Sequence, residues 1–292
     1  MPASPKIVFF GSGPVATATL EGLLPHIDVE AIITKPRAAG HRGSVPVLEL
    51  AESRGIPVFT PKNKQELTEL FETTSFTSNV GLVVDYGIII SRAVIDSFSK
   101  GIINSHFSLL PHWRGADPIT FSILGGQPHT AGVSLMLINE KLDEGELLAQ
   151  EPFILPPEIT TPELTDALVV RSNILLIDTL PKYLAGSVKP YAQPATAPSY
   201  SRKLIKEDGV LDSKKPADRL ALEVRAFAGW PKSKLTLFGH TIIVKKARVA
   251  SNKSDGALII ACGNHTFLEI LELTAPSGKT MTGADFLRGY KK

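Results

Sequence analysis

Short apolar runs recur along the first hundred residues, and segments of helical length separate them. Strands that are apolar throughout and alternate with helices are typical of a parallel sheet covered on both faces. The pattern therefore predicts an α/β fold with a Rossmann-like, mostly parallel sheet and helices on both faces. The predicted strands are residues 7–10, 29–33, 57–59, 80–84 and 101–104.

Beyond these strands, apolar segments at 131–137 and 147–154 flank a polar turn and predict two more strands. A helix should begin at Thr161, a good N-cap residue, with Pro162 in the first turn, where its missing N–H has no helical partner to lose. Apolar residues then recur at helical spacing as far as Gly186. They are Leu164, Leu168, Leu175 and Leu184.

Residues 187–204 are rich in Pro, Ala, Ser and Tyr and have no periodic apolar face, which indicates a semi-extended linker. We therefore expect one domain over residues 1–186 and a second over residues 205–292. The second domain should contain a helix and several short strands, the pattern of a small OB-like β-barrel. The helix is expected at 217–227 and the strands at 234–238, 241–249, 257–261 and 267–273.

Composition excludes several classes of protein. The chain has 292 residues, of which 43% are apolar, and no apolar run approaches the roughly 18 residues of a membrane span. Its first residues lack the apolar core of a signal peptide and the arginines of a transit peptide, so we expect a cytoplasmic protein. We also expect a monomer. A single cysteine, Cys262, excludes an internal disulfide. The seven histidines show no zinc-site spacing, so no metal is expected.

Charge is distributed unevenly between the two halves. Residues 1–187 contain 13 Lys/Arg and 20 Asp/Glu, whereas residues 188–292 contain 18 Lys/Arg and 9 Asp/Glu. Clustered basic side chains provide the sequence-independent part of nucleic-acid affinity. The basic half therefore indicates either a polyanionic partner such as RNA or simply a basic, well-solvated domain.

Three polar residues suit acyl transfer to an amine. Asn104 and His106 lie two positions apart at the end of a predicted strand, so their side chains should share one face. An amide donor and an imidazole aimed at one oxygen would stabilise an oxyanion, and a carboxylate such as Asp143 would move the proton of the amine. Each residue taken alone is more often a turn former or a structural group.

The motif Asn104-x-His106-x-Ser108-Leu109-Leu110-Pro111-x-x-Arg114-Gly115, followed by Leu142-Asp143-Glu144-Gly145, resembles the signature of the 10-formyltetrahydrofolate-dependent formyltransferases. The resemblance implies that Asn104, His106 and Asp143 are the catalytic residues. It also implies that 10-formyltetrahydrofolate donates the formyl group and that two short segments bind the folate. These segments comprise Ser108, Leu109, Leu110 and Pro111, and Tyr86, Gly87, Ile88 and Ile89.

The second half resembles the C-terminal domain of the branch of this family that acts on methionyl-tRNA. The resemblance rests on Arg225-Ala226-Phe227-x-x-Trp230-Pro231 and Ser277-Gly278-Lys279-x-Met281. It implies that initiator methionyl-tRNA is the acceptor. The candidate tRNA-binding residues are Arg37, Arg42, Lys245 and Lys246, although the basic loop at 34–45 is short for this branch.

Three other interpretations remain open. A sugar-nucleotide N-formyltransferase would use the same catalytic residues and a similar second domain. The turn at 11–16 fits a loose dinucleotide fingerprint, and Lys35 or Arg37 would suit the 2′-phosphate of NADP in an oxidoreductase. A non-catalytic RNA-binding protein is the third. The aromatic residues Phe107, Trp113 and Trp230 are expected to pack rather than to stack on a ligand.

Overall fold

The computed structural model describes residues 4–37, 45–127, 129–252 and 256–291. The chain divides into two compact units. The first comprises Met1–Gly115, Thr130–Phe153 and Thr165–Tyr200, and the second comprises Ala116–His129, Ile154–Leu164 and Ser201–Lys292. No helix in the described part of the chain is long and apolar enough to cross a membrane.

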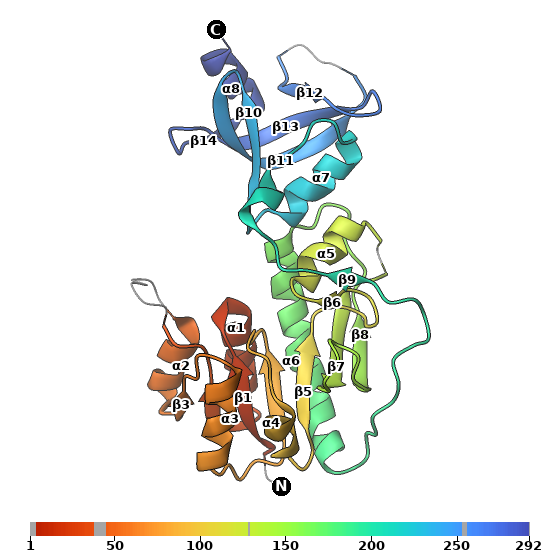
Figure 1. The fold of residues 1–292 in the computed structure, drawn as a ribbon. Coiled ribbons are helices and arrows are strands. Elements are labelled where there is room, and N and C mark those ends of the chain that lie inside the picture. Colours follow the sequence, from red (N-terminus) through yellow and green to blue (C-terminus); the bar gives the residue numbers. More distant parts are fainter. Residues whose placement is uncertain (1–3, 38–44, 128, 253–255, 292) are drawn as a thin grey trace. The chain divides into compact units, whose positions relative to one another are not determined.

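The first unit is built on a seven-stranded sheet with the order β3-β2-β1-β4-β5-β7-β8 (Figure 1). The strands from β3 to β5 run parallel, whereas β7 and β8 run antiparallel. The mostly parallel sheet expected from the apolar runs is confirmed. Its strands are β1 (Lys6–Gly11), β2 (Asp28–Ile33), β3 (Val58–Phe59), β4 (Gly81–Val84), β5 (Ile102–His106), β7 (Gly132–Leu137) and β8 (Leu147–Pro152).

Successive side chains of a strand point to opposite faces of the sheet, and in these strands most side chains on both faces are apolar. Helices therefore cover both faces of the sheet. On one face, Phe10 and Ile102 pack with Leu67 of α3 and Val94 of α4. On the other face, Ser105 of β5 contacts Ser172 of α6 through their hydroxyl oxygens, 2.7 Å apart. The helices are α1 (Gly13–Leu23), α2 (Pro46–Arg54), α3 (Lys64–Thr73), α4 (Arg92–Asp96) and α6 (Thr161–Leu184).

Helix α6 begins at Thr161, where the sequence predicts a helix start, and it continues through Pro181. Thr161 is the first helical residue rather than the N-cap, because Thr160 precedes the helix and bonds to Glu163 through its N–H and hydroxyl. Leu164 and Leu168 are fully buried, whereas Leu175 and Leu184 are only half-buried. The buried face continues instead through Leu176, Leu180 and Tyr183. The leucine spacing therefore identified the helix but misplaced the second half of its buried stripe.

The second unit contains the antiparallel, curled half-barrel sheet of an OB-like fold, with the order β10-β11-β13-β12 and β14 paired to β13. Its strands are β10 (Ser233–Leu237), β11 (His240–Ala250), β12 (Ile259–Ala261), β13 (Phe267–Thr274) and β14 (Thr280–Thr282). Its other elements are α5 (Pro118–Gly125), η1 (Lys206–Gly209), α7 (Ala217–Ala226) and α8 (Gly283–Tyr290). The short strands β6 (Arg114–Gly115) and β9 (Tyr200–Ser201) pair with each other.

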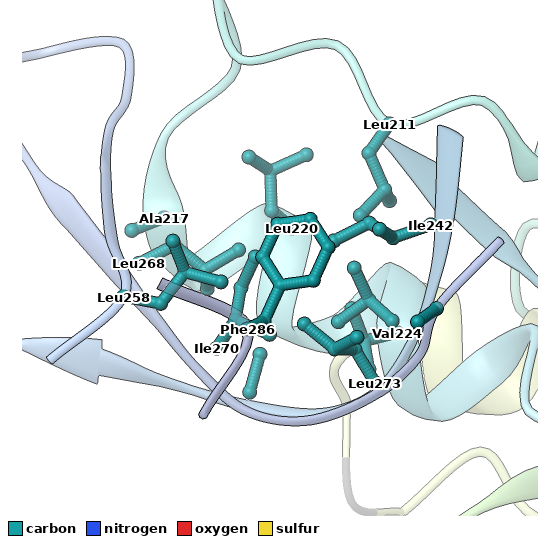
Figure 2. Close-up of a cluster of buried hydrophobic side chains, with 13 residues drawn as sticks. Leu211, Ala217, Leu220, Val224, Ile242, Leu258, Leu268, Ile270, Leu273 and Phe286 are labelled. Carbon is teal, nitrogen blue, oxygen red and sulfur yellow. The ribbon is translucent and has the colours of Figure 1, made fainter. Parts of the chain in front are cut away.

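The hydrophobic core of the second unit surrounds Phe286 of α8 (Figure 2). Leu220 and Val224 of α7, together with Ile270 and Leu273 of β13, contribute to the same buried cluster. The four strands and the helix α7 expected from the sequence are confirmed, whereas β14 and α8 were not foreseen. Helix α8 has only eight residues, so its apolar repeat is too short to identify by periodicity.

The carboxylate of Glu30 ties β2 to the segment that leads into β4. It accepts hydrogen bonds from the backbone N–H and hydroxyl of Thr77, at 2.8 and 2.9 Å, and of Ser78, at 2.7 and 2.6 Å. Burial, the largest single influence, raises the pKa of Glu30, but these four bonds together outweigh it. They lower the pKa from 4.5 to about 2. The ionised carboxylate therefore stabilises the folded chain.

We predict that Glu30→Gln lowers the free energy of unfolding at pH 7 by on the order of 1–3 kcal/mol. Because the folded-state pKa is depressed, the wild-type advantage is complete above pH 4.5 and disappears as the pH falls towards about 2. Urea denaturation at several pH values measures this difference. Glu21→Gln, at an exposed position of α1, is the matched control. If the free energy of unfolding of Glu30→Gln differs from that of the wild type as much at pH 3 as at pH 7, the stabilising role of the ionised Glu30 carboxylate is contradicted.

Candidate active site

Asn104 and His106 lie at the carboxyl end of β5, where the parallel part of the sheet ends. Ser105 points towards α6, so the two flanking side chains project from the opposite face. His106 is buried, with 5% of its surface exposed, and Asn104 is half-buried. The side chain of Asn104 has no hydrogen-bond partner among the described residues. Its amide is therefore available to a ligand at the edge of the sheet.

The His106 ring is oriented by a backbone carbonyl. Its Nε2 lies 3.0 Å from the carbonyl oxygen of Trp113. A carbonyl oxygen only accepts hydrogen bonds, so Nε2 must carry the proton of this pair. The remaining ring nitrogen, Nδ1, lies 3.8 Å from Oδ2 of Asp143. This geometry leaves Nδ1 as the atom that can gain or lose a proton near the carboxylate.

Asp143 reaches His106 because the connection between β7 and β8 folds back towards the end of β5. The residue has left-handed backbone geometry, with φ 49°. Its Oδ2 accepts a hydrogen bond of 2.7 Å from the backbone N–H of Gly115. The structure therefore brings together an amide, an imidazole and a carboxylate from two distant segments.

The Asp143 connection is further restrained by Gly145 and Arg114. A Cβ atom at Gly145 would overlap the backbone carbonyl of Leu137, so only glycine fits at this close approach. Arg114 forms an ion pair of 3.0 Å with Glu144, and the Arg114 side chain is only 12% exposed. The close backbone approach of Gly145 to Leu137 and the salt bridge between Arg114 and Glu144 consequently restrain the position of Asp143.

The turn formed by Ser108, Leu109, Leu110 and Pro111 follows directly after β5. Ser134 of β7 holds this turn, because its hydroxyl donates to the Ser108 carbonyl at 2.6 Å and accepts from the Leu110 N–H at 3.0 Å. Gln150 of β8 donates to the Leu110 carbonyl at 2.9 Å. Sequence reasoning did not identify Gln150, because a lone glutamine in a strand has no distinguishing pattern.

The second candidate folate segment, residues 86–89, leaves β4 at the same edge of the sheet as β5. The Tyr86 ring is buried against Phe10, and burial raises the pKa of its hydroxyl. Gly87 and Ile89 are exposed, with Ile89 at 74%, and Ile88 is partly buried. Tyr86 therefore supports the segment from within the core, and the exposed surface is formed by its neighbours.

The candidate tRNA-binding residues lie in separate parts of the chain. Lys245 and Lys246 are adjacent on β11, and both are exposed because the strand register shifts between Val244 and Lys246. Lys245 forms an ion pair of 2.8 Å with Glu272, whereas Lys246 has no ion pair with a described residue. Arg37 is exposed, and Arg42 lies outside the described residues.

The aromatic residues behave differently from one another. Phe107 is buried and Trp113 is half-buried, as expected. The expectation that Trp230 packs in a core is wrong, because 57% of its surface is exposed. Trp230 directly follows the exposed Gly229 and lies beyond the end of α7, so no apolar face of the helix covers it. No group of three or more metal-ligating side chains occurs in the residues that the structure describes.

Residues 6–180 match the formyl transferase family, and residues 203–291 match the formyl transferase C-terminal domain. The chain therefore belongs to the formyl transferase family and is a formyltransferase.

The similarity to one branch of this family extends over nearly the whole chain. The chain is 35% identical over 301 residues to a methionyl-tRNA formyltransferase of Myxococcus xanthus, covering 98% of this chain and 96% of that protein. It is also 35% identical over 298 residues to a methionyl-tRNA formyltransferase of Paramagnetospirillum magneticum, covering 98% and 97%.

Among solved structures, the fold is similar to an N-formyltransferase from Helicobacter canadensis in complex with folinic acid and dTDP-3-aminofucose. The TM-score is 0.69 at 17% identity, and the match covers 91% of this chain and 98% of that one. At this identity the comparison establishes the shared fold.

Proposed function

We propose that this enzyme transfers the formyl group of 10-formyltetrahydrofolate to the α-amino group of methionine on initiator tRNA. The observation that carries the chemistry is the convergence of Asn104, His106 and Asp143, with 3.8 Å between the imidazole and the carboxylate. The full-length similarity to methionyl-tRNA formyltransferases supports the acceptor. The half-buried Asn104 amide, which has no described partner, fits a ligand that brings a carbonyl oxygen to the sheet edge.

In the proposed mechanism, Asn104 and His106 stabilise the negative charge that develops on the formyl oxygen during attack by the amine. Both side chains project from the same face of β5, so the amide N–H of Asn104 and the Nδ1–H of the protonated His106 ring can converge on one oxygen. The Nε2–H of His106 remains bonded to the Trp113 carbonyl. Removal of one such donor typically lowers kcat by about 100- to 1,000-fold. This effect requires no movement of the strand, because His106 is already oriented by the Trp113 carbonyl.

Asp143 takes up the proton that the attacking amine must lose, directly or through a water molecule. It then returns the proton to N10 of the folate as the bond between N10 and the formyl carbon breaks and the carbonyl re-forms. One of its oxygens is engaged by the N–H of Gly115, and the carboxylate retains other lone pairs for the amine. Such proton transfer typically contributes about 100- to 10,000-fold to the rate. The side chain is only 13% exposed, so the carboxylate lies largely within the proposed site rather than in bulk solvent.

The folate is proposed to lie along the two segments at the carboxyl edge of the sheet. Ser108 shapes its turn by donating to the His112 carbonyl at 2.6 Å, and Leu110 is buried beneath it with Met136 and Leu147. Leu109 and Pro111 complete this wall of the proposed site. On the other segment, the backbone of Gly87 and the side chains of Ile88 and Ile89 provide the facing surface, and the buried Tyr86 supports it.

The basic second half is proposed to bind the phosphates of the tRNA through Lys245 and Lys246. Holding the tRNA in this way lowers the entropic cost of presenting its aminoacyl end to the catalytic residues. Arg37 and Arg42 are proposed to contribute further phosphate contacts, because a guanidinium group matches phosphate geometry. For Arg42 this assignment rests on the sequence alone.

A sugar-nucleotide acceptor is the second candidate, because the fold resembles an N-formyltransferase solved with dTDP-3-aminofucose. The two candidates share their donor and differ only in the amine. An acceptor assay therefore separates them without disturbing the catalytic residues.

We predict that the purified full-length chain formylates charged initiator methionyl-tRNA in the presence of 10-formyltetrahydrofolate. Glycinamide ribonucleotide and dTDP-linked amino sugars, supplied with the same donor, should react with a kcat/KM at least about 100-fold lower, because they lack the polyanion that the basic half binds. Transfer of radiolabelled formyl groups measures all three reactions. Preferential formylation of an amino-sugar nucleotide would contradict the proposed acceptor.

We predict that Lys246→Ala weakens binding of charged tRNA and reduces the slope of log K against log salt by about 1. Lys245→Ala is the comparison variant on the neighbouring residue. It should have a smaller effect, because the Lys245 charge is already compensated by Glu272 at 2.8 Å. Fluorescence titration over roughly 50–200 mM salt gives both slopes. Equal slopes for the wild type and Lys246→Ala would remove Lys246 from the tRNA contact.

A further inference from the structure

The segment at residues 191–199, here called the strap, has the composition of a linker but not the environment of one. Seven of its nine side chains are exposed, and the two exceptions are Gln193 and Ser199. Both residues belong to the first unit, as do the loops that they contact. The strap therefore directs only two polar side chains inward.

Gln193 makes three hydrogen bonds around the Asp143 connection. Its Nε2 donates to the backbone carbonyls of Asp143, at 2.7 Å, and Gly145, at 3.0 Å. Its Oε1 accepts from the Arg114 guanidinium at 2.7 Å. One side chain thus links the residue that carries the carboxylate to the arginine that is ion-paired with Glu144.

Ser199 binds the loop that orients His106. Its hydroxyl accepts from the N–H of Trp113 at 3.0 Å, and its carbonyl accepts from the N–H of Arg114 at 2.9 Å. Its own N–H donates to the Pro111 carbonyl at 3.2 Å. At the other end of the strap, Tyr191 pairs with Leu147 of β8 through two backbone hydrogen bonds of 2.7 and 2.9 Å.

These contacts reach both members of the His106–Asp143 pair. The backbone of Trp113 accepts from Nε2 of His106 through its carbonyl and donates to the Ser199 hydroxyl through its N–H. The backbone of Asp143, whose carboxylate faces Nδ1, is held by Gln193. The strap therefore restrains the two segments that set the 3.8 Å separation between ring and carboxylate.

We propose that Gln193 and Ser199 are positioning residues for formyl transfer, and that the strap acts as a clamp on the catalytic pair rather than as a passive linker. The inference rests on the proposed roles of His106 and Asp143. A displacement of about 1 Å between reacting groups can lower a rate by about 100-fold. Loss of the clamp therefore lowers kcat more than it affects folate binding or folding.

A merely structural role would give a different result. The strap side chains other than Gln193 and Ser199 are exposed, so no apolar core depends on them. Removal of a hydrogen bond from such a segment should lower Tm by only roughly 2–4 °C. The informative readouts are therefore kcat, the KM for the folate donor and Tm, measured on the same full-length preparations.

The experiment uses four variants and one control. Gln193→Ala removes all three hydrogen bonds, whereas Gln193→Glu keeps the acceptor for Arg114 but loses the two donors to the carbonyls. Ser199→Ala removes the hydroxyl, and Ser199→Thr restores it. Gln65→Ala, at an exposed position of α3 where the side chain donates a hydrogen bond to Glu69, is the matched control.

We expect both Gln193 variants to lower kcat by about 10- to 100-fold, with less than about threefold change in the KM for the folate donor. Ser199→Ala should lower kcat and Ser199→Thr should recover most of it, whereas Gln65→Ala should match the wild type. Wild-type kcat in Gln193→Ala and Ser199→Ala overturns the inference. So does a loss of kcat that is matched by a loss of folded protein.

Asp143→Ala separates failure of this inference from failure of the proposed function. Wild-type turnover in Asp143→Ala shows that the proposed catalytic assignment is wrong, and the clamp falls with it. If Asp143→Ala loses most of its turnover while Gln193→Ala and Ser199→Ala keep the wild-type turnover, the clamp is overturned and the catalytic assignment stands.

Discussion

The placement of the His106 imidazole between a backbone carbonyl and a carboxylate is the interaction on which the rest of the site depends. Trp113 holds Nε2 at 3.0 Å, and Asp143 lies 3.8 Å from Nδ1. The carbonyl only accepts hydrogen bonds, so Nε2 carries the proton of this pair. The other ring nitrogen, Nδ1, is the one that faces the carboxylate. Asn104 shares the same face of β5, so the strand geometry alone directs the third group to this point. Strand β5 thus positions the Asn104 amide and the His106 ring. The loop after β7 carries the Asp143 carboxylate, and the loop after β5 holds that carboxylate through the N–H of Gly115.

Much of this arrangement is predictable from local patterns. Apolar runs indicate the parallel strands, because strands buried on both faces need apolar side chains at every position. The shared face of Asn104 and His106 follows from the period of a strand, and the position of Ser105 against Ser172 agrees with it. The approach of Asp143 to His106 requires only that two strands flank the turn that contains it. Each of these predictions depends on neighbours in sequence or on one simple chain reversal.

The remainder depends on contacts that local patterns do not encode. The strap has a linker-like composition, yet Gln193 and Ser199 form hydrogen bonds with residues 48 to 88 positions away. Gln150 supports the Leu110 turn across 40 positions without belonging to any motif. Trp230 illustrates the converse, because an aromatic side chain suggests burial while the turn after α7 leaves it exposed. Single polar residues acquire these roles only through tertiary structure, and periodicity does not reveal them.

The central claim is that His106 and Asp143 act as one catalytic unit. A double-mutant cycle of His106→Ala, Asp143→Ala and the double variant, measured as kcat with saturating substrates, tests it most directly. Residues that act as a unit are strongly non-additive, so the double variant should lose no more than about tenfold beyond the more damaging single substitution. If the losses from the two single substitutions multiply in the double variant, the residues act independently and the claim is contradicted.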